Sequence, residues 1–146
     1  SRCCAALAAV WLHIRANCRM TPLKIAAVRI FVRDLEEAFA FYQGALGLPI
    51  AAGGPEAGYL VFKAQSCDLV VERVLPDAPP DEQILVCRFT GLSFAVSGID
   101  QLCHALAAQG VRFVGQPERQ AWGGTLATLS DPAGNQLQLV EYPGVV

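Results

Sequence analysis

The side chains that most often perform chemistry are scarce in this sequence. It has two histidines, His13 and His104, and six cysteines that form no C-x-x-C pair. A zinc cluster is therefore not expected, and neither a Ser-His-Asp nor a Cys-His arrangement nor a phosphate-binding glycine loop is evident. A chain of 146 residues can build a core without disulfides, so the cysteines are expected to be reduced thiols that behave mostly as small apolar residues.

An arginine within an apolar strand is the first candidate for a binding residue. Arg29 lies between Ala27 and Phe31 on one face of the segment 24–32, and a guanidinium buried there without a partner would be costly. It could form an ion pair with Glu72 or another acid, or it could bind the carboxylate or phosphate of a ligand in bidentate fashion. Phe31 could form an apolar wall beside it, although a core position is the commoner role for such an aromatic.

Three residues of the second half complete the set of candidates. Gln138 lies in the segment 136–141, where polar and apolar residues alternate, so its amide points away from the apolar face. Ser93 lies in another segment with the composition of a strand. Trp122 is followed by two glycines in a loop at the start of a strand, which makes it a candidate for the rim of a pocket.

The elements that would position these residues follow one order twice. In the first half, Asp34 is a suitable N-cap with two acids in the following turn, and Gly47 can end the helix. Val32 and Val96 occupy equivalent places, with an offset of 64 residues. This spacing predicts an internal duplication. The predicted elements are strands 24–32, 59–63, 69–74, 91–96, 111–114, 125–129 and 136–141, and helices 35–46 and 99–109.

The connections between these elements indicate the fold class. Segment 76–81 holds three prolines and two acids, so it is predicted to link a first repeat, about 24–75, to a second, about 89–142. The strands outside each helix come in hairpin-like runs, which predicts an α+β fold with mixed, mainly antiparallel sheets. Loops 51–58 and 77–83 would set the size of any pocket.

The last hairpin has a turn of characteristic composition. In Asp131-Pro132-Ala133-Gly134-Asn135, Pro132 presets its φ angle, Gly134 accepts a positive φ, and Asp131 can bond the backbone two residues on. The turn is predicted to join two strands whose leucines share one face.

Two segments resemble the vicinal oxygen chelate superfamily, which includes glyoxalase I, extradiol dioxygenases, fosfomycin-modifying enzymes and bleomycin-binding resistance proteins. One is residues 120–142, QAWGGTLATLSDPAGNQLQLVEY, with the D-P-x-G-N turn that marks the family. The other is residues 27–48, with the V-x-D-L helix entry and the F-Y…L-G-L helix exit. Together they bracket about 120 residues. The resemblance implies two βαβββ modules whose sheets curl around a concave pocket.

The resemblance also supplies four positions at which metal-dependent members hold an ion, usually with His or Glu. Alanine and glycine at two of them have no donor atom, and an amide oxygen at a third is a poor ligand for zinc, iron or nickel. Metal-assisted chemistry would therefore lack its centre, and no metal or other cofactor is expected. The carried-over positions are Ala27, Gly91, Gln138 and either Val70 or Glu72.

Two functions are compatible with these residues. The first is a metal-free protein that sequesters a small organic ligand, as bleomycin-binding resistance proteins do, without catalytic residues. The alternative is a lyase, isomerase or dioxygenase of the same superfamily, with a metal at unfamiliar positions or acid–base chemistry by Glu72. Whether the protein is an enzyme stays open. The predicted ligand-binding residues are Arg29, Phe31, Glu72, Ser93, Trp122 and Gln138.

Composition bounds the partners and the compartment. With 53% hydrophobic and 16% charged residues, the chain is expected to form a homodimer. A net charge of −2 gives no electrostatic support for nucleic-acid binding, and no apolar run reaches the roughly 18 residues of a membrane span, so a cytoplasmic protein is expected.

Residues 1–19 have three arginines and no acid. Their Ala/Leu-rich composition favours a helix, and they are predicted to be a dispensable helical extension of a domain at 20–146. The alternative is a secretion signal, but no A-x-A-like cleavage site follows the short apolar segment.

Overall fold

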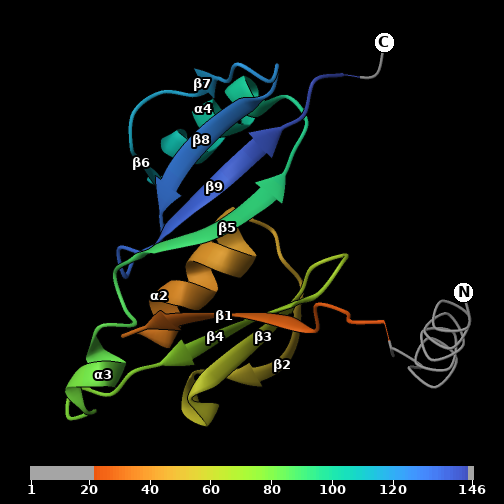
Figure 1. Cartoon of the computed structure of the whole chain (residues 1–146). Helices are drawn as coiled ribbons and strands as arrows, with labels where there is room; N and C mark the ends of the chain where they lie inside the picture. Colours follow the sequence, from red (N-terminus) through yellow and green to blue (C-terminus); the bar gives the residue numbers. More distant parts are fainter. Residues whose placement is uncertain (1–21, 145–146) are drawn as a thin grey trace, which may run out of the picture.

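The computed structural model describes residues 22–144, which form two modules of the same design (Figure 1). The first module has four strands in the order β1-β4-β3-β2. The edge strand β1 runs parallel to β4, whereas β3 pairs antiparallel with both β4 and β2. Its elements are β1 (Ala27–Val32), α2 (Leu35–Phe39), η1 (Ala40–Ala45), β2 (Ile50–Gly54), η2 (Pro55–Ala57), β3 (Tyr59–Lys63) and β4 (Asp68–Arg73).

The second module repeats this plan with an extra short strand. Its strands follow the order β5-β9-β8-β6, and β7 also pairs with β8. Strand β5 is parallel to β9, and the other pairs are antiparallel. The predicted α+β fold with two βαβββ modules and mixed sheets is therefore confirmed. Its elements are β5 (Phe89–Ala95), α4 (Ile99–Ala108), β6 (Arg112–Phe113), β7 (Glu118–Arg119), β8 (Thr125–Ser130) and β9 (Gln136–Glu141).

A neighbouring side chain caps α2, and a distant side chain caps α4. The Asp34 side chain accepts hydrogen bonds from the amides of Glu36 and Glu37 at 2.9 and 3.1 Å, so the predicted N-cap of α2 is confirmed. Helix α4 starts at Gly98 without a cap of its own. Instead Glu141, at the end of β9, accepts from the amides of Gly98 and Ile99, which ties this helix to its sheet.

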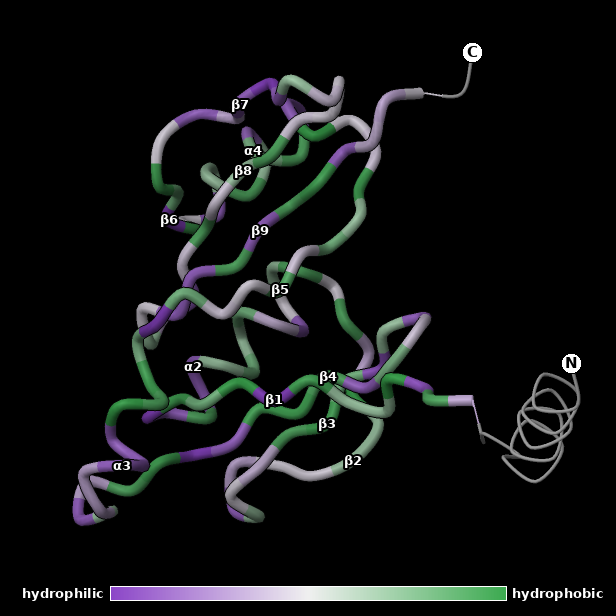
Figure 2. Tube along the Cα trace, in the orientation of Figure 1, coloured by the Kyte–Doolittle hydropathy of each residue, from purple (hydrophilic) through white to green (hydrophobic). Residues whose placement is uncertain are grey.

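One core lies under both helices. The helix-facing residues of the strands are almost fully buried: Ile30 and Val32 are each 1% exposed, and Leu137 is 0% exposed. They belong to a single cluster with residues from α2 and α4. The tube in Figure 2 changes between green and purple along β1, as expected of a strand with one buried face. The predicted alternation of buried and open faces is thus confirmed in both modules.

Besides the short elements β7 and η2, three elements differ from the sequence-based expectation. Residues 50–54 form strand β2, not part of a loop, because pairing with β3 overrides the low strand propensity of an Ala/Gly run. The first helix changes from α to π geometry at Ala40. The linker contains a short helix, α3 (Pro80–Gln83). No helix within residues 22–144 is long and apolar enough to cross a membrane, and the predicted extension 1–19 lies outside the described residues.

Candidate functional site

Each sheet has one face covered by helix and core and one open face, and the candidate residues within strands lie on the open faces. On the sheet of β1–β4, which we call the first open face, strand register aligns the side chains of neighbouring strands. On the sheet of β5–β9, the second open face, the same alternation applies. The first open face contains Ala27, Arg29, Phe31, Tyr59, Val61, Val70 and Glu72, and the second contains Ser93, Ala95, Thr128, Gln136 and Gln138.

An ion pair lies at the centre of the first open face. The Arg29 guanidinium donates from Nη2 to Oε1 of Glu72 at 2.9 Å and from Nε to Oε2 of the same carboxylate. It also lies 5.2 Å from the centroid of the Phe31 ring. The hydrogen bond and the charge of Glu72 raise the pKa of Arg29. Of the two predicted roles, the structure forms the ion pair, so the formal charges at this place cancel.

Arg29 nevertheless remains accessible. Its side chain is 61% exposed, against 28% for Glu72. Two of its N–H groups bind Glu72, out of the five that a guanidinium carries. The pair can therefore still present donors to a ligand without presenting a net charge.

The second open face carries uncharged hydrogen-bonding groups. Ser93 lies beside Gln138 in the register of β5 and β9. The Gln138 amide donates from Nε2 to Oγ1 of Thr128 at 3.3 Å. A bulge between Phe89 and Ser93 accompanies a positive φ of 72° at Gly91. The predicted polar residues of this half are thus brought together.

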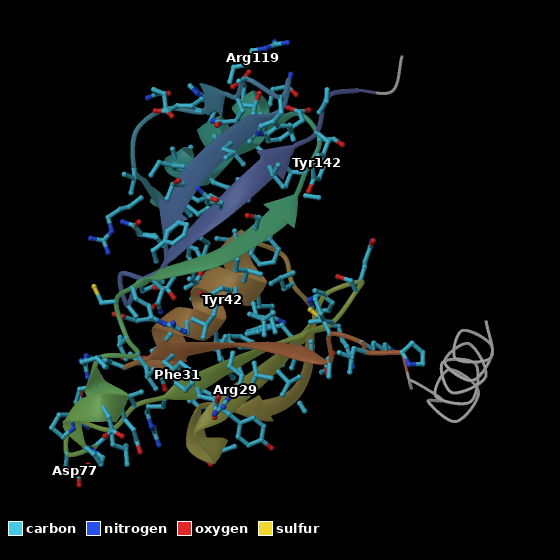
Figure 3. All side chains as sticks on the ribbon, in the orientation of Figure 1. Arg29, Phe31, Tyr42, Asp77, Arg119 and Tyr142 are labelled. Atoms are coloured by element: carbon cyan, nitrogen blue, oxygen red, sulfur yellow. The ribbon has the colours of Figure 1, made fainter. Side chains whose placement is uncertain are left out.

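Within one chain the two open faces do not enclose a common space. Both sheets turn their covered faces to the shared core, and α2 lies between β1 and β5 (Figure 1). Figure 3 shows Arg29 and Phe31 on the first sheet, apart from the strands of the second. The structure therefore brings together Arg29, Phe31 and Glu72, and separately Ser93 and Gln138, but not the two groups.

Trp122 lies at the far end of the second sheet. The residue is 51% exposed, and the centroid of its ring is 5.9 Å from that of the Tyr142 ring. A Cβ atom at Gly124 would come within 1.9 Å of this ring, so the glycine allows the ring to fold over the backbone. Next to Trp122 is a surface cleft of about 640 Å³ whose lining includes Gly123, Tyr142 and Arg119.

Two aromatic residues of the open faces are not among the binding residues predicted from the sequence. Tyr59 is 42% exposed and lies beside Glu72 in the register of β3 and β4. Tyr142 follows β9, where it continues the alternation of Gln138 and Val140. In both cases period-2 alternation was the available signal.

Strand register also decides between the two candidates for the fourth metal-ligand position. Arg29 pairs with Val70, and its equivalent in the second module, Ser93, pairs with Gln138. Val70 is therefore the counterpart of Gln138, and Glu72 lies two residues further along β4. The four positions then hold Ala27, Val70, Gly91 and Gln138, which do not fit a transition-metal ion. No group of three or more His, Cys, Asp or Glu side chains gathers elsewhere within residues 22–144.

These features define the class of protein. Residues 24–139 match the model of the Glyoxalase/Bleomycin resistance protein/Dioxygenase superfamily. The chain belongs to this superfamily, and the resemblance found in the two end segments is confirmed.

Solved structures agree with this assignment. A superfamily member from Sphaerobacter thermophilus DSM 20745 is 28% identical, with a TM-score of 0.69 over 84% of this chain and 100% of that chain. TnmS3, an antibiotic binding protein from Streptomyces sp. CB03234, is also 28% identical, with a TM-score of 0.67 over 86% of this chain and 100% of that chain. A lactoylglutathione lyase from Agrobacterium tumefaciens, 22% identical with a TM-score of 0.67 over 83% of this chain and 95% of that chain, is alike in fold alone.

Proposed function

We propose that this protein is a metal-free binding protein that sequesters a small organic molecule on its open faces. The observation that carries the proposal is the set of residues at the four metal-ligand positions, none of which is a strong ligand. The similarity to an antibiotic binding protein over its whole length supports it. The proposed contact residues are Arg29, Phe31, Glu72, Ser93, Trp122 and Gln138.

The chemistry of the faces favours an uncharged aromatic ligand. Arg29 and Glu72 neutralise each other, and the second face offers amide and hydroxyl groups. Phe31 and Trp122 provide rings on which an aromatic system could stack. A few polar groups within an apolar site fix the orientation of a ligand, so carbonyl or hydroxyl oxygens on the ligand would match these donors and acceptors.

We further propose that two chains complete the site as a homodimer. In one chain both faces are open, and they carry large exposed aromatics such as Tyr59 and Phe89, 42% and 56% exposed. Apolar surface of this kind is commonly covered by a partner, and a two-fold axis is the usual arrangement. A pocket would then combine the first open face of one chain with the second open face of the other.

A thermal-shift screen tests the ligand class, because a ligand that binds only the folded state raises the melting temperature. Uncharged aromatic antibiotics are expected to give larger shifts than aromatic acids or amines of similar size. Arg29→Ala and Trp122→Ala should reduce the shifts. Arg33→Ala is the matched control, since this arginine bonds Gln83 in the linker and lies outside both faces.

The outcomes of this screen separate the hypotheses. Ligands that bind both mutants as tightly as the parent would show that the site lies elsewhere. A preference for acids that is lost in Arg29→Ala would instead establish Arg29 as an anion anchor. The enzyme alternative makes a different demand, a bound metal or turnover, and is addressed by metal analysis.

A further inference from the structure

The turn between β8 and β9 contains an unusual concentration of buried polar groups. Asp131 and Asn135 are both 0% exposed, and they are the polar side chains that the residues 22–144 bury most completely. Buried polar groups must find partners within the protein. Most hydrogen-bond partners of Asp131 and Asn135 lie outside the second module.

Asn135 uses both ends of its amide to reach other parts of the chain. Its Nδ2 donates to the backbone carbonyl of Phe31 in β1 at 2.8 Å and to Oδ2 of Asp131 at 3.0 Å. Its Oδ1 accepts from the amides of Cys87 and Arg88 at 3.0 and 3.4 Å. One side chain therefore joins the second module, the linker and the first module.

Asp131 adds a second connection. Its Oδ2 accepts a hydrogen bond from the hydroxyl of Tyr42 at 2.7 Å, and its Oδ1 accepts from the amide of Asn135 at 2.8 Å. Tyr42 belongs to the first module and is itself 0% exposed. Figure 3 shows Tyr42 between the two sheets. We call Tyr42, Asp131 and Asn135 the intermodule network.

This network opposes movement of one sheet relative to the other. Rotation of the modules would separate Tyr42 from Asp131 and Asn135 from Phe31, and each buried group would lose its partner in a place that water does not reach. The bond to the Phe31 carbonyl lies directly behind a ring of the first open face. The network therefore adds directional contacts to the shared apolar core that joins the two modules.

We propose that the intermodule network positions the binding site, with Asn135 as the positioning residue that fixes β1 at Phe31 relative to the second sheet. The proposal rests on the proposed function only in assuming that the open faces bind a small molecule. The orientation itself can be measured without any ligand.

Residual dipolar couplings of backbone amides provide the test, because they report the orientation of each sheet in the folded protein. In the parent protein one alignment tensor should fit both modules. In Asn135→Ala and in Tyr42→Phe, which keeps the ring, the couplings of the two modules should require different tensors when both are fitted to the coordinates of the parent protein. Thr128→Val is the matched control: it removes a hydrogen bond within one sheet and should preserve the common tensor.

Each result has a defined meaning. A single tensor in both folded variants would overturn the positioning role. If Asn135→Ala does not fold, Tyr42→Phe alone decides, and unfolding of both would reduce the network to a contribution to stability and overturn the proposal. Failure of the ligand screen would remove the proposed function but would leave the result on orientation unchanged.

Discussion

In the proposed site, the Arg29–Glu72 pair would determine which ligands the first open face accepts. Alone, the arginine would select anions and the glutamate would select cations. Together they present donors without a net charge, since both oxygens of the carboxylate are engaged by the guanidinium. The sequence showed both residues and both possible roles. It could not choose between them, because the choice depends on the register that places β1 beside β4.

The residues at the metal-ligand positions predict the metal content of the protein. Protein purified without chelator, then offered zinc, nickel, iron and manganese, should retain no stoichiometric metal by elemental analysis, because Ala27, Val70 and Gly91 have no side-chain donor. One tightly bound equivalent per chain that disappears in Glu72→Gln would contradict this expectation and revive the enzyme alternative.

Tyr42 predicts a dependence of stability on alkaline pH. Burial, with a contribution from Asp131, raises the pKa of Tyr42 far above its ordinary value. Its hydroxyl therefore stays protonated in the folded state while it ionises in the unfolded state above about pH 10. The stabilisation is complete below that pH and is lost as the pH rises, by up to about 1.4 kcal/mol per pH unit for one group.

Denaturant titrations of the parent and Tyr42→Phe at several pH values would measure this effect. The mutant lacks the ionisable group, so its free energy of unfolding should fall less steeply above about pH 10. Parallel curves for the two proteins would show that Tyr42 ionises freely in the folded state.

At the scale of elements, the helices and strands that depend on local residue types were predicted, whereas those that depend on distant strand pairing were not. The N-cap Asp34, the strands β3 and β9 and the ends of both main helices follow from residue types and spacing. Strand β2 has no comparable local signal, because its pairing with β3 forms it. The π segment η1 also departs from the predicted α-helix. The prediction that Asp131 bonds the backbone two residues on was wrong, since it bonds the amide of Asn135, four residues on.

A substitution at Gly134 measures how much the turn between β8 and β9, which contains Asp131 and Asn135, contributes to stability. Its φ is 86°, and a Cβ atom there would lie 2.7 Å from the sulfur of Cys87. Gly134→Ala should lower the free energy of unfolding by about 1–2 kcal/mol from the left-handed conformation alone. Gly44→Ala is the control, since no atom lies within 4 Å of its added Cβ, and its stability should be unchanged or higher. Equal denaturation midpoints for both variants would contradict the prediction.

At the scale of the whole molecule, the open faces predict self-association. The chain has a sequence mass of 15.6 kDa, and light scattering at micromolar concentration should give twice this value. A mutation that places a charge in the middle of a face, such as Val61→Lys, should shift the protein towards the monomer, because a buried unpaired charge is strongly unfavourable. A parent protein with the mass of one chain would refute the proposed dimer, and the ligand would then have to bind a single face.

The site as a whole was less predictable than its parts. Alternation along each strand placed Arg29, Phe31, Ser93 and Gln138 on faces opposite the core, as the structure shows. Asn135 connects the two sheets through hydrogen bonds to partners more than 40 residues away. No pattern within one strand reports such a contact.

The duplication has produced two halves with unequal chemistry. The first open face has a neutralised ion pair beside the Phe31 ring, whereas the middle of the second has amide and hydroxyl groups, with the rings of Trp122 and Tyr142 at its end. In a pocket formed from one face of each kind, the two sides of a guest molecule would meet different surroundings. Such a guest would have one preferred direction of entry, because turning it around would move its oxygen atoms from the amide and hydroxyl groups to the ion pair and forfeit the contacts made on each side. In the proposed dimer, a chain built from two copies of one unit would in this way distinguish one end of a molecule from the other.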